Sequence, residues 1–188
     1  MGVAGAAGIS MRSVCREAAL TERYFYESFA NIDQLMITVL EIVVLDARAA
    51  LLSVPATSQT FTPDLVRQGV DAFTDYLTTD PRRGRIMFIE SQVSPLLATR
   101  AIALVEQFVV PIVRSVGAGN VAATELDAVD VSLNAVAIFG ALAFLYRRAL
   151  TEGPQVDRER FAEHAAQVIE PIALARSSRS GSGAARDR

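Results

Sequence analysis

Apolar residues recur at spacings of three and four along almost the whole of this 188-residue chain. That spacing is typical of helices that bury one face, whereas a half-buried strand alternates apolar and polar residues. No alternating run bounded by Asn-Gly or Asp-Gly turns occurs in the sequence. The sequence therefore predicts an all-α fold, in which Gly, Pro and Ser/Thr-rich stretches separate the helices.

Residues that commonly begin helices stand where the periodic segments start. Ser10, Thr21, Asn31, Thr62 and Asp157 each carry an oxygen that can accept from the free N–H groups of a first helical turn. With these starts and the intervening breakers, we expect helices over 10–18, 22–28, 32–52, 63–78, 83–92, 96–115, 124–150 and 157–174.

Composition excludes several classes of protein. Apolar residues make up 51% of the chain, which is ample for a buried core. The single cysteine, Cys15, cannot form an internal disulfide, and with the single histidine, His164, it cannot build a zinc site from nitrogen and sulfur ligands. Because the chain also lacks a Gly-rich phosphate loop and a nucleophile elbow, we expect no enzyme, no metal and no cofactor.

Residues 10–29 form the most informative segment. Ser10 begins a short helix, residues 18–20 make a tight turn, and Thr21 begins a second short helix. Phe25 and Phe29, four residues apart, share the inner face of the second helix. Two short helices joined by a turn of three to four residues are typical of a helix-turn-helix, whose second helix lies in the major groove of DNA.

This segment resembles the DNA-binding region of the tetracycline-repressor (TetR) family, in wording typical of its actinobacterial branch. The family's Ala-Gly-Val-like turn corresponds to Ala18-Ala19-Leu20, and its Tyr-x-x-Phe ending corresponds to Tyr26-Glu-Ser-Phe29. The family's next helix, which opens Lys-x-x-Leu, corresponds to Ile32-Asp-Gln-Leu35. The family also has a helix before this motif; because residues 1–9 are rich in Gly and Ala, we expect that first helix to be short or missing.

The resemblance implies a cytoplasmic, homodimeric transcriptional repressor that a small-molecule effector releases from double-stranded operator DNA. It implies that Arg23 and Tyr24 reach base edges, and that phosphates are contacted by Ser10, Arg12, Thr21 and Tyr26. Residues 1–35 hold three arginines against four carboxylates, a net charge of −1, although phosphate neutralisation supplies much of DNA affinity. A helical ligand-binding and dimerisation module with impaired DNA binding is therefore the alternative function.

The expected organisation is a DNA-binding domain at 1–35, a larger helical regulatory domain at 36–175 and a disordered tail at 176–188. Sites between bundle helices are common, and two polar residues, Glu90 and Asn134, could turn inward to orient a mainly apolar ligand. The other candidate pocket residues are Phe73, Tyr76, Leu77, Met87, Phe88, Phe108, Ile138 and Leu142. Plain core packing is an equally good interpretation of each aromatic residue.

Two late helices carry more apolar surface than one bundle can cover, and the resemblance implies that they pair with their symmetry mates. The candidate interface residues are Val136, Phe139, Gly140, Ala143, Phe144, Phe161, Ala165, Val168, Ile169 and Ile172. The longest apolar run, Leu133 to Tyr146, is about 14 residues long, shorter than the roughly 20 that span a bilayer. We therefore expect a buried helix and no membrane.

Overall fold

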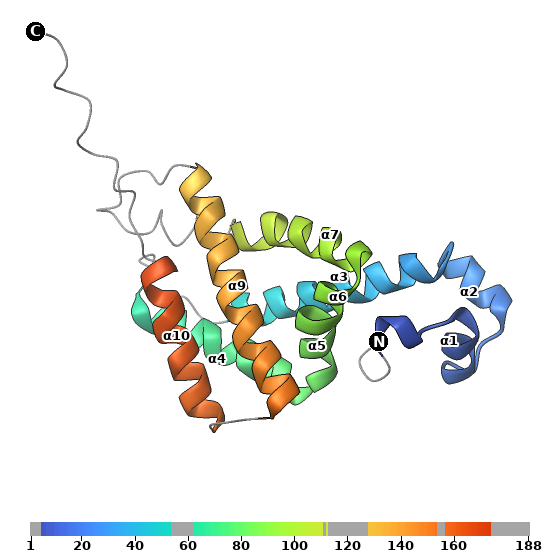
Figure 1. The fold of residues 1–188 in the computed structure, drawn as a ribbon, viewed down its shortest axis with the longest axis horizontal. Helices are drawn as coiled ribbons and strands as arrows, with labels where there is room; N and C mark the ends of the chain where they lie inside the picture. Colours follow the sequence, from blue (N-terminus) through green and yellow to red (C-terminus); the bar gives the residue numbers. More distant parts are fainter. Residues whose placement is uncertain (1–4, 54–61, 111, 113–127, 154–156, 174–188) are drawn as a thin grey trace, which may run out of the picture.

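The computed structural model describes residues 5–53, 62–110, 112, 128–153 and 157–173 (Figure 1). Every regular element in these ranges is a helix, and the same ranges contain no strand, so the expected all-α class is confirmed. The expected tail at 176–188 lies outside the described residues, as do positions 111, 113–115, 124–127 and 174 of the expected helices.

Within the described residues, the chain forms short helices at its start and four long helices later, α3, α4, α9 and α10. In order, the elements are η1 (Ala6–Gly8), α1 (Met11–Glu17), α2 (Glu22–Ser28), α3 (Ile32–Leu52), α4 (Pro63–Thr79), α5 (Pro81–Arg85), η2 (Ile86–Glu90), α6 (Ser91–Val93), α7 (Pro95–Leu104), η3 (Val105–Val109), α9 (Ala128–Glu152) and α10 (Arg158–Ala173). The side chains of Asn31, Thr62 and Asp157 each accept a backbone N–H three residues further on, at 2.9, 3.3 and 2.8 Å. These caps fix where α3, α4 and α10 begin.

The helix expected over 83–92 begins earlier, at Pro81. Asp80 caps it by accepting from the Arg82 N–H at 3.1 Å, and a proline in the first turn has no N–H that would be left without a partner. Ser94 and Pro95 repeat this arrangement at the start of α7. The backbone widens into a π-helical segment after α5, which is η2, and into another after α7, which is η3. The apolar spacing does not predict either segment.

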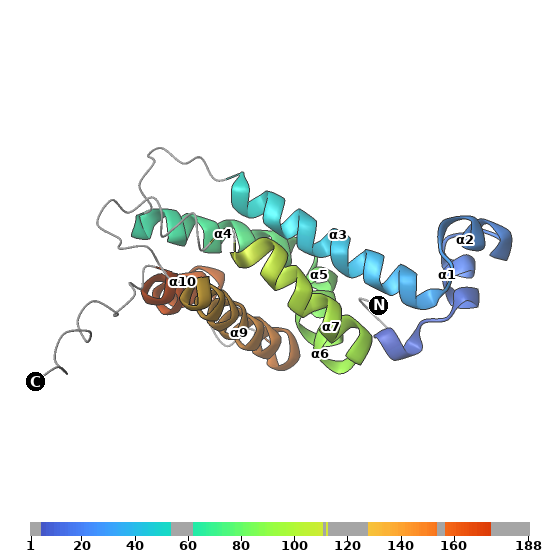
Figure 2. The same ribbon diagram turned by 90° about the horizontal axis from the view of Figure 1, so that it is seen from above.

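Helix α3 connects two parts of the molecule. In Figure 1, α1 and α2 lie at one end, beyond the start of α3, whereas α4, α9 and α10 gather toward the other end. Helix α4 packs against α3 and α10, and α10 also packs against α9. Figure 2 shows α7 beside α3, where the two helices are in contact. The bundle thus packs along α3 from Met36 to Ala47 and leaves the α1–α2 pair outside it.

The core of the bundle contains an aromatic group around Tyr146. The rings of Phe73 and Phe88 lie with their centroids 5.5 Å from that of Tyr146. The hydroxyls of Thr74 and Tyr146 are 2.5 Å apart, and because the Thr74 hydroxyl donates to the Val70 carbonyl, the Tyr146 hydroxyl is the donor to Thr74. Burial raises the pKa of Tyr146 to about 12.

Candidate functional site

Helices α1 and α2 are joined by a turn with a defined hydrogen-bond pattern. Ser10 and Ser13 form a reciprocal cap at the start of α1. At its end, the Leu20 N–H donates to the Cys15 carbonyl at 2.9 Å, and the Ala19 N–H donates toward the Arg16 carbonyl at 3.3 Å. This is the Schellman arrangement, which requires a left-handed residue after the helix. Ala19 supplies it with a φ of 53°.

The α1–α2 pair has a small apolar interior and a polar outer face. Cys15 and Phe25 are buried between the helices, and the Phe25 ring lies 5.7 Å from that of Phe29. The outer face carries most of the expected DNA-contacting residues as exposed side chains: Arg12, Thr21, Arg23, Tyr24 and Tyr26. Ser10, the remaining one, is exposed and occupied in the cap of α1. Thr21 stands at the start of α2, but its side chain makes no capping hydrogen bond, contrary to expectation.

Arg23 on α2 forms an ion pair with Glu27 that is exposed to solvent. Its side chain is 85% exposed, and its Nε lies 3.0 Å from Glu27 Oε1 on the next turn of the helix. An exposed pair of this kind contributes about 0–1 kcal/mol. Because that energy is small, the guanidinium can leave Glu27 and bind another acceptor at little cost.

Glu90, expected to orient a ligand, instead holds the segment that precedes α1. Its carboxylate is 5% exposed and accepts from the Ala6 N–H at 2.7 Å and from Arg85 Nε at 3.1 Å. Gly5, with a φ of 73°, allows the close approach, because a Cβ there would lie 3.2 Å from Glu90 Oε1. Buried charges are stable when they are paired and hydrogen-bonded in this way. Glu90 therefore has a structural partner set that does not involve the pocket.

Two more of the expected pocket residues also have roles in packing. Tyr76 donates from its hydroxyl to the Val43 carbonyl at 2.9 Å, and its ring lies under the Arg83 guanidinium at 4.3 Å. Burial raises the pKa of Tyr76, an effect that the nearby Arg83 opposes. Leu77 is 3% exposed in the core. Neither residue, nor Glu90 nor Asn134, is among the described residues that line the cavity.

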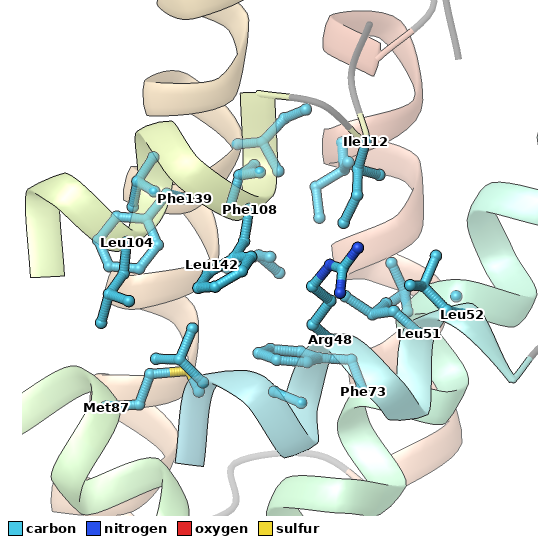
Figure 3. Close-up of a pocket in the computed structure, with 18 of the residues that line it drawn as sticks. Arg48, Leu51, Leu52, Phe73, Met87, Leu104, Phe108, Ile112, Phe139 and Leu142 are labelled. Carbon is cyan, nitrogen blue, oxygen red and sulfur yellow. The ribbon is translucent and has the colours of Figure 1, made fainter. Parts of the chain in front are cut away.

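A cavity of about 450 Å³ lies between α3, α4, α7, α9 and α10 (Figure 3). Six of the expected pocket residues line it: Phe73, Met87, Phe88, Phe108, Ile138 and Leu142. Its volume is within the roughly 300–1,000 Å³ of small-molecule sites in proteins. The arrangement is therefore large enough for a small organic ligand with an apolar body.

Sequence reasoning missed the α3 side of this cavity. Leu40, Val44, Ala47, Arg48 and Leu51 line it from one face of the helix. Their spacing of three and four residues marks a shared face, and that signal was present in the sequence. The apolar period does not distinguish a face that lines a cavity from one that packs against a neighbouring helix.

Arg48 is the only charged residue among the described residues of the lining. Figure 3 shows its guanidinium directed into the space between the α3 side and Phe108, and its Cζ lies 5.5 Å from the centroid of the Phe108 ring. Arg48 and its neighbour Leu52 are exposed, so the cavity reaches the surface near the end of α3. A cation thus stands where the apolar space meets solvent.

The expected dimer residues divide into exposed and buried groups. Val136 and Phe144 are 55% and 73% exposed, as is Leu133 at 61% on the same face. Gly140 lies between them with open space beside its Cα. We call these four residues the α9 stripe. Of the others, Phe139 and Ile169 line the cavity, Ala143 and Ala165 are buried within the chain, and Phe161, Val168 and Ile172 are half-buried.

By length and composition, α9 is apolar enough to cross a membrane, and 22% of its most apolar window is buried within the chain. The window is 18 residues long, whereas the apolar run from Leu133 to Tyr146 is about 14 residues long. Two bent segments, Pro81–Val93 and Pro95–Val109, meet the same criterion only as a pair. A single helix of this kind is weak evidence for a membrane span, but α9 is longer and less buried than expected from the sequence.

Arg82, Arg83 and Arg85 form a basic cluster whose charges are engaged within the chain. Arg82 pairs with Asp80 at 2.7 Å and Arg85 with Glu90 at 3.1 Å, while Arg83 donates to the Tyr76 carbonyl.

Within the described ranges, no group of three or more His, Cys, Asp or Glu side chains is placed to hold a metal ion. Comparison of the sequence with protein-family models finds no match. Comparison with curated proteins finds no match either.

Proposed function

We propose that this chain is a cytoplasmic, homodimeric transcriptional regulator that reads operator DNA through α2 and is released from it by a small, mainly apolar ligand. The observation that carries the proposal is the α1–α2 pair: two short helices joined by a tight turn, with Arg23, Tyr24 and Tyr26 facing solvent. Tyr24 and Tyr26 leave large aromatic side chains 56% and 60% exposed, and phosphates and base edges are partners for tyrosine and arginine side chains.

The assigned roles follow from the resemblance of residues 10–29 to the TetR family. Arg23 and Tyr24, near the start of α2, would meet base edges in the major groove, because recognition helices contact bases with their N-terminal residues. Ser10, Arg12, Thr21 and Tyr26 would meet phosphates. Arginine suits bidentate contact with guanine, and the weak pairing of Arg23 with Glu27 leaves its guanidinium available for that contact.

A dimer is proposed from the α9 stripe. Leu133, Val136 and Phe144 are large apolar side chains that one chain leaves in water, and Gly140 permits close approach of a second helix. Two-fold pairing of this stripe would cover it and would present two α2 helices to a near-palindromic site.

Helix α3 provides the connection between ligand and DNA in this proposal. Three residues separate it from the end of α2, and its residues from Leu40 onward line the cavity. A ligand that favours one position of α3 over another would shift the spacing of the two α2 helices, because a ligand stabilises the state to which it binds better. The repressor form of the proposal holds that the ligand-bound state fits DNA less well.

The alternative is a helical ligand-binding and dimerisation module with impaired DNA binding. The net charge of residues 1–35 favours this alternative, because three arginines are outnumbered there by four carboxylates. The arginines are Arg12, Arg16 and Arg23, and the carboxylates are Glu17, Glu22, Glu27 and Asp33. The two functions share the cavity and the dimer, so only a DNA-binding experiment separates them.

The test is fluorescence anisotropy with the DNA upstream of the protein's own coding region, measured as a salt series. We expect binding that weakens with salt and is about 5- to 150-fold weaker in Arg23→Ala, the loss of about 1–3 kcal/mol expected for one bidentate base contact. Arg67→Ala is the matched control, because Arg67 is an exposed arginine on α4, far along the chain from α2. Absence of binding at low salt, or equal effects of the two variants, supports the alternative module.

The dimer is tested separately by sedimentation of Phe144→Glu. A carboxylate in the α9 stripe should convert the dimer to monomer, whereas Val93→Glu, at a side chain equally exposed at 73% outside the stripe, should not. A wild-type chain that sediments as a monomer contradicts the dimer while leaving the DNA-binding test valid.

A further inference from the structure

The charge distribution around the cavity is one-sided. Its described lining contains aliphatic and aromatic side chains, one methionine, one glycine and a single ionised group, the Arg48 guanidinium. No carboxylate is recorded as a partner of Arg48 within the described ranges; its contact there is the ring of Phe108, at 5.5 Å. By contrast Arg100, also close to α3, is neutralised by Glu41 at 2.7 Å. Among its described lining residues, the cavity is therefore an apolar space with one cation, Arg48, at its opening.

We propose that the cavity binds an amphipathic monoanion, an apolar body that ends in one carboxylate, with the carboxylate on Arg48. This rests on the proposed function in that the cavity is the effector site, and it narrows the effector from a mainly apolar molecule to a carboxylic acid. The apolar body lies among Phe73, Phe88 and Leu142, inside the bundle. The carboxylate lies at the exposed end, where it keeps part of its hydration.

The chemistry of the guanidinium favours a carboxylate over other head groups. Its planar set of donors matches the two oxygens of a carboxylate in a bidentate, charge-assisted pair. One guanidinium balances one carboxylate charge, whereas a phosphate monoester carries about −1.5 to −2 at neutral pH and would be left with excess charge. A cationic head group would meet repulsion from Arg48 and would find no acid among the described lining residues.

The cavity volume limits the length of the apolar body. A methylene group is about as large as a water molecule, whose share of liquid volume is about 30 Å³. A space of about 450 Å³ therefore holds on the order of 10–15 such groups. Each methylene that enters contributes about 0.8 kcal/mol, or roughly fourfold in affinity, and this gain ends when the cavity is full.

The experiment is isothermal titration calorimetry of the full chain at pH 7.5, without DNA, with three ligands that share a decyl chain. They are sodium decanoate, 1-decanol and decyltrimethylammonium. We expect decanoate to bind about tenfold more tightly than decanol and the cation to bind more weakly than either. In Arg48→Gln the preference for decanoate over decanol should disappear, while decanol should bind as in the wild type. Arg67→Gln, which removes an exposed charge outside the cavity, should keep the preference.

Two further measurements locate the ligand. Affinity for octanoate, decanoate and dodecanoate should rise about fourfold per methylene, and the rise should have ended in hexadecanoate, whose chain is longer than the roughly 10–15 groups that the cavity holds. Gly69→Phe, at a lining position where an added Cβ meets nothing closer than 3.6 Å, should block all three decyl ligands while the circular dichroism spectrum stays helical. The proposal is overturned if decanol binds as tightly as decanoate, if Arg48→Gln keeps the preference, or if Gly69→Phe leaves binding intact.

Because no DNA is present in these titrations, their failure does not bear on DNA recognition. A chain that binds decanoate through Arg48 but does not bind DNA refutes the proposed regulator and retains the ligand class. A chain that binds DNA through Arg23 but does not bind decanoate retains the proposed regulator and refutes the proposed ligand class.

Discussion

Replacing Ala19 by glycine should stabilise the turn between α1 and α2. Ala19 has a φ of 53°, in the left-handed region where a side chain costs about 1–2 kcal/mol. Glycine removes that cost, but its greater freedom in the unfolded chain offsets about 0.4–1 kcal/mol of the gain. The net expectation is that Ala19→Gly stabilises this turn by about 0.5–1 kcal/mol.

The preceding residue provides a matched control. Ala18 has φ −82° and ψ −4°, an ordinary right-handed conformation, so glycine relieves no strain there. Ala18→Gly should therefore destabilise the turn by about 0.5–1 kcal/mol. The same substitution at adjacent positions is expected to have opposite signs, and only the backbone geometry of the turn explains such a result.

Hydrogen exchange at the Leu20 amide is the appropriate assay, because that amide donates to the Cys15 carbonyl across the turn. Where exchange reports the opening equilibrium, the Leu20 amide should exchange about two- to fivefold more slowly in Ala19→Gly and correspondingly faster in Ala18→Gly. If both variants exchange faster by similar factors, Ala19 is not left-handed in solution and the reasoning is refuted.

Three other substitutions test the bundle. Tyr146→Phe removes the hydroxyl that donates to Thr74 and should lower the free energy of unfolding in urea by about 1 kcal/mol; no loss would mean that this hydrogen bond contributes nothing net. Gly69→Ala should raise it by about 0.5–1 kcal/mol, since the new Cβ meets its nearest neighbour at 3.6 Å; a decrease would indicate a strained site. The hydrogen bond from Arg82 lowers the pKa of Asp80 to about 2, below the value of about 3.9 in an unfolded chain. Ionised Asp80 therefore stabilises the folded chain above pH 4, and this stabilisation is lost as the pH falls through 2. Asp80→Asn should remove that part of the acid dependence, and an unchanged stability–pH profile between pH 4 and 2 would contradict the assignment.

Local chemistry in the sequence predicted the elements whose ends are set by local contacts. The bounds of α2 and α3 match the expected ranges 22–28 and 32–52. For α3 this accuracy has a physical cause, because Asn31 and Gln34 form the cap within four residues of each other. The π-helical segments η2 and η3 were not predictable in this way, because their backbone widening has no counterpart in the apolar period.

The candidate site was predicted only where it consists of conspicuous apolar side chains. Phe73 and Phe108 were expected in the pocket and line the cavity. Arg48 was missed because an arginine in a long amphipathic helix has the same sequence pattern whether it faces solvent or a cavity. Glu90 was expected to meet a ligand, but it bonds to the Ala6 N–H, 84 residues away. A backbone group has no side-chain identity, so such a partner leaves no trace in the sequence.

The continuity of α3 gives the cavity a mechanical connection to α2. Twenty-one residues in one unbroken helix form a rod about 30 Å long. If the cavity end of such a rod is the pivot, a tilt of about 5° displaces the other end by about 2.5 Å, a distance comparable to the length of a hydrogen bond. A ligand could therefore move α2 out of register with a fixed row of acceptors without unfolding a single turn. In the proposed regulator, a rigid-body tilt of α3, rather than a series of side-chain contacts, would transmit ligand binding in the cavity to α2.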